Sequence, residues 1–212
     1  MSHDDGRNIL RSQDGWSVVL SPHDAVVRLA ENWHYSRSAA LTSVAAHLLI
    51  DPQGGLAGGA LWMPPLPPAA KAAVDFCDRP PEMWKKVLVL SRLVVSPTAP
   101  HNAASFLLSH SAAMVDTGRW PILLTFADTA QGHTGAIYKA CNWTYAGLTE
   151  GSETWVSPTG EQRGRKRGPK NIPVEEMIAA GYTRIKSQKH RFILDRTGKK
   201  QKPFVGQQLK MF

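Results

Sequence analysis

The segment spanning residues 122–147 limits most narrowly what this chain of 212 residues can fold into. It begins with an apolar run at 122–127 that is short and β-compatible, which predicts a buried strand. A polar turn follows, residues 134–141 have helical spacing, and residues 143–146 have the pattern of another strand. A strand, a polar turn, a helix and a strand in this order indicate an α/β protein that gathers polar groups at the carboxyl edge of a sheet.

The polar turn and the helix of this segment contain candidate catalytic residues. Asp128, Gln131 and His133 follow the predicted strand, and Tyr138 lies on the predicted helix. Carboxylate, imidazole and phenol groups can exchange protons, as general acid–base catalysis requires. A structural role stays open for each residue alone, because Asp128 can cap a helix and His133 tolerates a turn. Helical spacing predicts core contacts for Ala136, Ile137, Ala140 and Cys141.

A second cluster of reactive side chains follows an earlier helix. Residues 15–20 alternate like a first strand, and a helix is predicted from there to about Trp33, with Ser21 as its N-cap and Pro22 at its first position. Four reactive side-chain types then stand in sequence: His34, Tyr35, Ser36 and Arg37. Such a cluster at a helix exit suits acid–base work or metal ligation, and a structural His-Tyr pair is the alternative.

The middle of the chain is expected to form the central strands of the sheet. Residues 44–50 and 56–62 predict a hairpin. The proline-rich residues 63–68 are expected to form a loop that is neither helix nor central strand, before a short helix at 69–76. Residues 86–95 are apolar on both faces, which predicts a central strand.

Ser91 and Arg92 interrupt this predicted central strand. A charged side chain there is costly unless it is paired, so Arg92 is expected to meet an acid, a phosphate or a substrate. A structural salt bridge is the alternative. An amphipathic helix is predicted at 102–118 after a turn.

The charge of the chain is concentrated near its C-terminus. The net charge is +8, and residues 163–202 hold 13 Lys and Arg against the three acids Glu175, Glu176 and Asp195. A localised basic surface suits the phosphate backbone of a nucleic acid, whereas a solvated tail that aids solubility is the alternative. We therefore expect a catalytic core at 1–158 and a basic DNA-binding extension, packed on the core, at 159–212.

Within and before this extension the expected elements are short. Residues 152–158 predict a last edge strand, and 159–171 a mobile basic loop without an apolar period. A short helix is expected at 173–180, a strand at 189–194 and a basic tail at 199–212.

The sequence lacks the motifs of several classes of enzymes and metal-binding proteins. The chain has no P-loop, no GxGxxG after a strand, no nucleophile elbow and no zinc-type cysteine set. Cys77 and Cys141 lie in apolar surroundings, which predicts reduced thiols in an intracellular protein. No apolar run is long enough to span a membrane, and the N-terminus lacks the apolar segment of a signal peptide, so a soluble cytoplasmic protein without a membrane partner is expected.

The predicted order of elements resembles the GNAT acyltransferase fold, which implies a central mixed sheet flanked by helices (α/β, or α+β). In that resemblance residues 88–95 form the central strand, and 137–143 are similar to the family's Ala-x-x-x-Tyr-x-x-x-Gly-Phe region. GNAT proteins bind the coenzyme A pyrophosphate through a Q/R-x-x-G-x-G/A loop. Residues 98–104 lack those glycines, although backbone amides at the next helix could still face an anion. The degenerate loop argues against an ordinary acetyl-coenzyme A donor, and the sequence leaves the donor unknown.

A closer resemblance is to the bacteriophage Mom family. The residues that carry it are His34-Tyr35-Ser36-Arg37, Leu90-Ser91-Arg92-Leu93, the block 127–138, Asn142-Trp143 and Lys189-His190-Arg191-Phe192. The resemblance covers about residues 16–195, and 127–143 is its most specific part. It implies an enzyme that places a carbamoylmethyl (acetamido) group on adenine N6 in double-stranded DNA and so shields phage DNA from host restriction.

This resemblance implies roles for the candidate residues. Asp128 would be the base or the N6 partner, Tyr138 a hydrogen-bonding or stacking group, and His34 with Tyr35 an acid–base or metal site. Arg92 and Ser91 would hold the donor or a phosphate. The remaining substrate and donor contacts would be Gln131, Gly132, His133, Arg37 and Asn142. The DNA contacts would be Arg163, Arg165, Lys166, Arg167, Lys170, Lys189, His190 and Arg191.

The resemblance also implies an iron requirement. His34 is the candidate metal ligand, with His101, His133 and Asp128 as further residues to test, because the sequence shows no ligand set. Two other functions stay open: an N-acetyltransferase that acts on an amine or protein, and a non-catalytic DNA-binding protein. The sequence leaves open the oligomeric state, with a homodimer as one alternative, and also the DNA target sequence.

Overall fold

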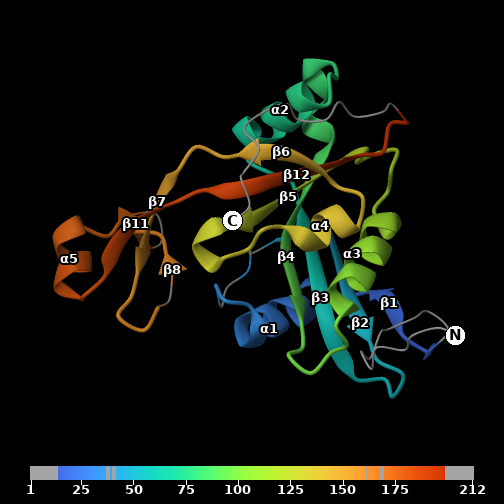
Figure 1. Cartoon of the computed structure of the whole chain (residues 1–212), viewed down its shortest axis with the longest axis horizontal. Helices are drawn as coiled ribbons and strands as arrows, with labels where there is room; N and C mark the ends of the chain where they lie inside the picture. The colour runs from blue at the N-terminus through green and yellow to red at the C-terminus, as the bar shows by residue number, and fades with distance from the viewer. Residues whose placement is uncertain (1–13, 37–38, 40–41, 161, 168–169, 199–212) are drawn as a thin grey trace, which may run out of the picture.

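A seven-stranded sheet with helices on both faces forms the body of the protein (Figure 1). The computed structural model describes residues 14–36, 39, 42–160, 162–167 and 170–198. In spatial order the strands are β1 (Ser17–Leu20), β2 (Ala45–Ile50), β3 (Leu56–Met63), β4 (Val87–Val95), β5 (Ile122–Asp128), β12 (Lys189–Asp195) and β6 (Thr144–Leu148). The pair β4–β5 is parallel and the other pairs are antiparallel, which confirms the predicted mixed sheet flanked by helices.

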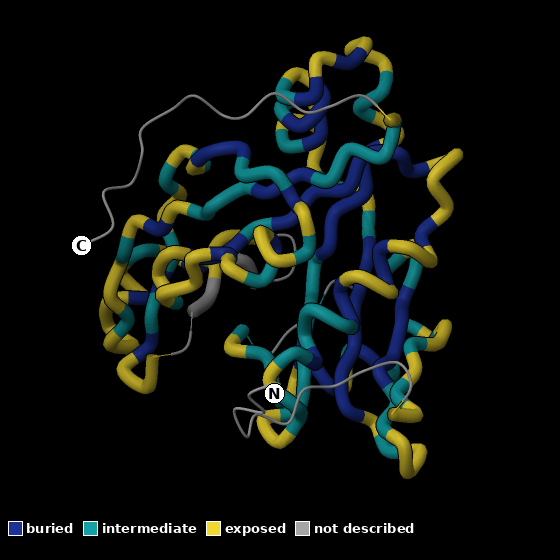
Figure 2. The backbone as a smooth tube through the Cα atoms, turned by 45° about the vertical axis from the view of Figure 1, so that its right-hand side comes forward, coloured by how far each residue is buried: buried dark blue, intermediate teal, exposed yellow. Residues whose placement is uncertain are grey.

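Helices cover the sheet on its two faces. The helices that pack on the body are α1 (His23–Trp33), α2 (Pro67–Phe76), α3 (Ala103–Met114) and α4 (Ala136–Ala140). On β4, Val87 and Val89 pack with α2, whereas Leu88 and Leu90 pack on the opposite face with α3. The strand is thus apolar on both sides and central, as predicted, and the four strands β2 to β5 in the middle of the molecule are largely buried (Figure 2).

Strands β4 and β5 separate toward their carboxyl ends. They pair only between Val87–Val89 and Ile122–Leu124, after which β4 stays with β3 and β5 stays with β12. The register of β3 against β4 also shifts, since Leu61 faces Arg92 while Trp62 faces Leu90. Ser91 is therefore the extra residue of a bulge, the kind of irregularity that re-aims side chains beside active sites. This bulge explains why Ser91 and Arg92 interrupt the apolar pattern.

A smaller unit projects from the body at the left of Figure 1. Its sheet has the order β11 (Thr183–Ser187), β7 (Ser152–Val156) and β8 (Gln162–Arg163), and the helix α5 (Val174–Ala179) packs Met177 against Trp155. Two prediction errors concern this unit. Strand β7 lies in the middle of the small sheet and is no edge strand. The segment 159–171, expected to be a mobile basic loop, contains β8 and the short ladder of β9 (Lys166–Arg167) with β10 (Lys170–Asn171).

Several helix boundaries also differ from those predicted. Pro22 is itself the N-cap residue of α1, so Ser21 is not its N-cap. Helix α2 begins at Pro67 within the proline-rich run, because proline is tolerated in a first helical turn. Helix α3 ends at Met114, four residues before the predicted end at residue 118.

The expected core face of α4 was confirmed for Ile137 and Cys141, which pack against the core, and wrong for the two alanines. Tyr138 is its buried residue, while Ala136 and Ala140 are exposed and Ile137 and Cys141 are half-buried. Asn142 ends this helix as predicted, with a left-handed φ of 62°. Cys77 and Cys141 are free thiols, as predicted.

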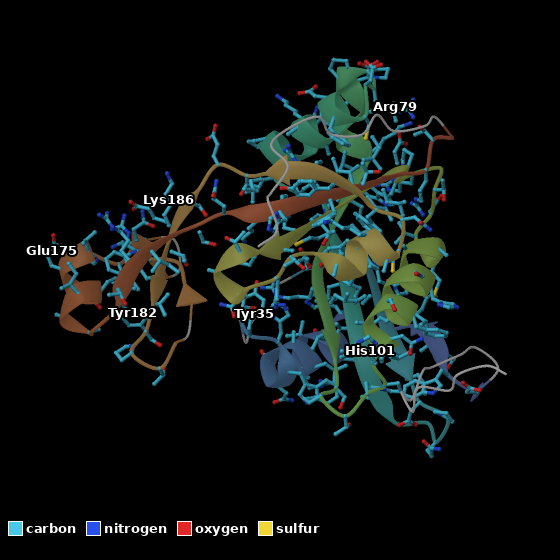
Figure 3. The ribbon with its side chains drawn as sticks, in the orientation of Figure 1. Tyr35, Arg79, His101, Glu175, Tyr182 and Lys186 are labelled. Carbon is cyan, nitrogen blue, oxygen red and sulfur yellow. The ribbon has the colours of Figure 1, made fainter. Side chains whose placement is uncertain are left out.

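The C-terminal part of the chain is joined to both sheets. Strand β12 lies in the main sheet between β5 and β6, and a buried ion pair of 2.6 Å ties Asp195 at its end to Arg79 after α2 (Figure 3). The division at 158/159 stays a prediction, and the predicted basic tail at 199–212 lies outside the described residues. No helix in the described ranges is long and apolar enough to cross a membrane.

Candidate active site

A cavity of about 1030 Å³ opens where β4 and β5 separate. Its wall includes residues from both faces of the sheet: Val89 and Phe126 belong to the α2 side, whereas Leu90 and Ala127 belong to the α3 side. The cavity therefore reaches from one face of the sheet to the other. It brings together these predicted site residues: His34, Tyr35, Ser91, Arg92, Asp128, Gly132, His133, Tyr138 and Lys189.

Three segments far apart in the sequence meet at its polar end. The ring centroids of His34 and Tyr35, just after α1, are 4.3 Å apart. Tyr35 also meets His133, which follows β5, with ring centroids 5.6 Å apart. Figure 3 places Tyr35 between the end of α1 and the loop after β5. The charges of Arg92 and Asp128 act on the Tyr35 phenol, so the predicted acid–base residues form one cluster.

The hydrogen bonds of His34 determine its tautomer. The backbone N–H of Ser36 donates to Nδ1 at 3.2 Å, and the Ser36 hydroxyl lies 2.8 Å from the same nitrogen. A nitrogen that accepts an N–H carries no proton, so the neutral ring is protonated at Nε2. Burial, reinforced by the positive charge of Arg92 and by His133, lowers the pKa of His34 to about 4. His34 is thus a neutral hydrogen-bond donor at neutral pH.

Burial also shifts the pKa values of the other titratable groups that line the cavity. Burial raises the pKa of the Tyr35 phenol, and the negative charge of Asp128 raises it further, so Tyr35 stays protonated. Burial lowers the pKa of Arg92, and this guanidinium donates to the Ser91 carbonyl at 2.5 Å. Tyr138 is buried, and its pKa is raised by burial although a hydrogen bond with Thr125 opposes the rise.

Asp128 is buried at the end of β5 and receives two hydrogen bonds on one oxygen. Its Oδ1 accepts from the Ala130 N–H at 3.0 Å and from the Ser187 hydroxyl at 2.7 Å. The first contact makes Asp128 the cap of a short 3₁₀ turn, η3 (Thr129–Gln131), so the structural role considered from the sequence is present. The carboxylate nevertheless lines the cavity, where its other oxygen can face a ligand.

Two glycines shape the loop that carries His133. Gly132 and Gly135 have φ angles of 67° and 74°, in the left-handed region that other residues rarely adopt. A Cβ at Gly135 would lie 2.1 Å from the ring of Phe192, so only glycine lets α4 approach β12 this closely. The loop can therefore turn His133 toward Tyr35 at the cavity.

Sequence reasoning missed the apolar wall of the cavity. It is formed by Met63, the proline-rich residues 64–66, Ala69 and Phe126. The proline-rich run was identified as a loop, but nothing in its composition indicated that it borders a cavity. Ser187, the partner of Asp128, was missed too, because a lone serine at a strand end carries no signal.

Some predicted substrate contacts lie elsewhere. Gln131 and Asn142 are not among the residues that line the cavity, and Arg37 lies outside the described residues. His101, considered for a metal, is exposed in the loop before α3 and does not line the cavity either.

The predicted DNA-contact residues lie partly on β12 and partly in the segment 163–170. Lys189 and Arg191 project to one face of β12 and His190 to the other, because side chains alternate along a strand. Arg191 donates to the Ala146 carbonyl at 2.9 and 3.2 Å, and His190 lies 3.2 Å from the Tyr145 hydroxyl. Arg165 donates to the Ile172 carbonyl at 3.3 Å. Lys170 is exposed, and the side chains of Arg163, Lys166 and Arg167 are outside the described part.

The described residues offer no ready-made metal site. Within the ranges that the structure describes, no three His, Cys, Asp or Glu side chains are grouped to hold an ion. A metal on Nε2 of His34 would also require the proton there to leave. The iron expected from the resemblance and its ligand His34 stay predictions.

The loop between β4 and α3 also differs from a pyrophosphate cradle. Two of its amides already bond within the turn, Ala99 to the Ser96 carbonyl and Ala103 to the Pro100 carbonyl. Together with the missing glycines, these bonds leave the segment poorly matched to a coenzyme A pyrophosphate. The donor therefore stays undetermined.

Comparison with solved structures establishes the fold. The chain is similar to a candidate phosphinothricin N-acetyltransferase (13% identity, 86% of this chain and 99% of that chain, TM-score 0.50). It is also similar to a mutant spermidine N-acetyltransferase from Vibrio cholerae (7% identity, 86% and 95% of the chains, TM-score 0.51). At such low identity these likenesses show an acetyltransferase-like fold, as predicted, and no particular substrate.

Sequence comparison gives the family. None of the curated proteins compared with the chain matches it significantly. The model of the Mom protein family, in contrast, matches residues 16–210, which is nearly the whole sequence. The chain therefore belongs to the Mom protein family.

Proposed function

We propose that this protein transfers a carbamoylmethyl group to N6 of adenine in double-stranded phage DNA and thereby protects that DNA from host restriction nucleases. The observation that carries the proposal is the cavity between β4 and β5, where the buried carboxylate of Asp128 lies in one cluster with a neutral imidazole and a phenol. Membership of the Mom family and the acetyltransferase-like fold support a transferase.

The chemistry of adenine sets what the site must do. The N6 lone pair is delocalised into the ring, so N6 is a poor nucleophile unless a proton is withdrawn during transfer. The base is also hidden inside the duplex, and enzymes that act on a base extrude it into a pocket. Ligand pockets commonly hold roughly 300–1,000 Å³. At about 1030 Å³, this cavity has room for a purine and for the reactive end of a donor.

In the proposed reaction Asp128 accepts the N6 proton. As the N6 lone pair forms the bond to the methylene carbon of the carbamoylmethyl group, the bond from that carbon to its leaving group breaks, and the leaving group departs with the bonding electron pair. The N6 proton passes to the carboxylate oxygen that Ser187 and Ala130 do not occupy. General bases of this kind typically contribute about 10²–10⁴-fold in rate.

His34 and Arg92 act on the groups around the reacting atoms. His34 donates from Nε2 to a ring nitrogen of the base or to the carbonyl oxygen of the transferred group, since its Nδ1 is occupied by Ser36. Arg92 lines the cavity from the bulge of β4 and supplies the positive charge that holds an anionic part of the donor. Ser91 is at the same bulge.

The apolar wall receives the base. Phe126 and the proline-rich residues 64–66 provide flat and rigid apolar surface, on which a planar heterocycle can stack. The polar cluster borders the same cavity, so a base against this wall can present its exocyclic amine to Asp128. Leu66 is 78% exposed, which suits a lip over which an extruded base enters.

Duplex DNA reaches the cavity along the projecting unit. Lys189 lines the cavity, while Arg184 and Lys186 are exposed on β11, directly before it in the chain. Together with the basic residues of 163–170, they supply the charge that phosphates require, consistent with the net charge of +8.

Mass spectrometry of nucleosides from DNA of cells that express the protein tests this function. The expected result is a deoxyadenosine that carries the mass of a carbamoylmethyl group and is absent from cells with the empty vector. Unmodified DNA, together with coenzyme A binding that needs no DNA, would favour an N-acetyltransferase. Unmodified DNA with tight duplex binding would favour a non-catalytic DNA-binding protein.

A further inference from the structure

Ser187 is a buried hydroxyl at the junction between the two sheets. It is the last residue of β11, and β12 begins at Lys189, whose register partner is Asp128. Ser187 is 4% exposed and Asp128 is 5% exposed, and their side chains meet at 2.7 Å. The projecting unit thus reaches the proposed catalytic carboxylate through the Ser187 side chain.

The backbone around this hydroxyl is fixed by further hydrogen bonds. The carbonyl of Gln188 accepts from the Thr129 hydroxyl at 2.7 Å and from the Thr129 N–H at 3.1 Å. On the other side of the junction, the Lys189 N–H donates to the Thr149 hydroxyl at 3.0 Å. These bonds hold the junction against both β5 and the end of β6, so the backbone that carries the Ser187 side chain is held in place.

The two donors to Asp128 converge on the same oxygen. Ser187 donates its hydroxyl hydrogen and Ala130 its N–H, and both bonds end on Oδ1. A free carboxylate can turn about its terminal torsion and exchange its two oxygens. A half-turn would only put the equivalent oxygen in the same place, but any smaller turn would break both bonds, so the carboxylate plane is fixed with one oxygen held and the other able to face the cavity.

We infer that Ser187 is a positioning residue for Asp128, and this inference rests on the proposed function. Its hydroxyl orients the carboxylate so that Oδ2 meets the N6 proton in the transfer step. A small misplacement of a reacting group can cost about 10²-fold in rate. Loss of the Ser187 hydroxyl should therefore slow modification by about 10–100-fold without weakening DNA binding.

A matched control is available in the same unit. Ser157 is 9% exposed, and its hydroxyl lies 2.8 Å from the Thr159 hydroxyl. Ser157→Ala removes a buried serine hydroxyl of the projecting unit, as Ser187→Ala does, but it does not touch Asp128. If buried serines only stabilise this unit, the two variants should behave alike.

The test follows the accumulation of modified deoxyadenosine per molecule of protein in cells expressing the wild type, Ser187→Ala, Ser187→Thr or Ser157→Ala. Thermal unfolding and duplex affinity of each purified protein are measured beside it. We expect about 10–100-fold slower accumulation for Ser187→Ala only, with rescue by Ser187→Thr and unchanged duplex affinity. Adding Ser187→Ala to Asp128→Asn should slow accumulation no further, because residues that act as one unit are not additive.

The outcomes separate the two claims. If the wild type modifies DNA and Ser187→Ala matches it, or loses no more rate than Ser157→Ala, the role of Ser187 is overturned while the proposed function stands. Further slowing in the Asp128→Asn background would also overturn it, since Ser187 would then act independently of Asp128. If the wild type leaves DNA unmodified, the proposed function fails, and the inference fails with it.

Discussion

The ring of Tyr35 meets the ring of His133 edge-on, with centroids 5.6 Å apart and planes at 75°. The two residues come from the end of α1 and from the loop after β5, and both line the cavity between β4 and β5. Edge-to-face contact is a favoured geometry for aromatic pairs. The contact therefore connects the two reactive segments that the sequence presents separately, and it fixes the polar end of the cavity.

His34 should make stability depend on pH. Its pKa falls from 6.5 to about 4 on folding, so the unfolded chain binds a proton between these values that the folded chain does not. The contribution of His34 to the free energy of unfolding is therefore complete above about pH 6.5 and decreases as the pH falls toward 4. Thermal unfolding at about pH 7 and pH 5 should show a smaller decrease for His34→Asn than for the wild type.

Burial also lowers the pKa of His47, which contributes to the same pH dependence. The His34→Asn protein should thus keep part of the decrease. An identical change in melting temperature for both proteins would contradict the assignment of His34 as a buried neutral ring.

The tautomer of His34 predicts that this residue is not an iron ligand. Because the Ser36 N–H occupies Nδ1, the ring offers a donor and no free lone pair. His34→Ala should therefore reduce DNA modification while the iron content of the purified protein stays unchanged, and His34→Gln should keep part of the activity by donating from its amide. Elemental analysis beside the modification assay checks this. A decrease in iron content that parallels the decrease in activity would instead make His34 a ligand.

Gly135 and Gly132 form a matched pair for a stability test. Both have left-handed φ angles, which typically cost an L-residue about 1–2 kcal/mol. Among the residues that the structure describes, a Cβ at Gly132 meets nothing within 4 Å, whereas one at Gly135 collides with the ring of Phe192. Gly135→Ala should therefore lower the free energy of unfolding in urea by clearly more than Gly132→Ala. Equal decreases would show that α4 moves away from β12 at little cost.

The strands at the centre of the fold could be predicted, and many of the residues that line the cavity were named from the sequence, but their arrangement around one cavity could not be predicted. Strands β4 and β5 are continuous apolar runs, so their burial on both faces follows from their composition. That Asp128 faces the same cavity as His34 and Arg92 depends on where the two strands separate and on the bulge at Ser91. Such register effects arise from pairing between distant segments, which periodicity along one segment does not encode.

The place of the C-terminal part in the sheet could not be predicted from its sequence either. Its basic composition predicted an extension, yet β12 inserts between β5 and β6 in the main sheet. An apolar strand with basic residues at its entry has the same pattern at an edge and in the interior. Ser187 reaches Asp128 only because of this insertion, so its role could not be predicted before the strand order was known.

The basic residues Arg163, Lys166 and Arg167 of β8 and β9 should contribute to DNA binding through phosphates. We expect the combined change of Arg163, Lys166 and Arg167 to Ala to weaken duplex binding and to reduce its salt dependence. The log–log slope should fall by about 0.9 for each phosphate that the variant no longer neutralises. Arg165 is left unchanged because its guanidinium holds the Ile172 carbonyl. Titrations of a duplex at several salt concentrations measure the slope, and an unchanged slope would remove these residues from the interface.

The central claim is that Asp128 accepts the proton when adenine N6 is modified. Modified deoxyadenosine, measured by mass spectrometry in DNA from cells with equal amounts of wild-type and Asp128→Asn protein, tests it most directly. The substitution keeps the shape of the side chain and removes its charge and basicity. We predict abundant modification by the wild type and at least about 10²-fold less by Asp128→Asn, with the fold and the duplex affinity retained. A decrease of less than about tenfold would contradict the claim and leave Asp128 as the cap of η3.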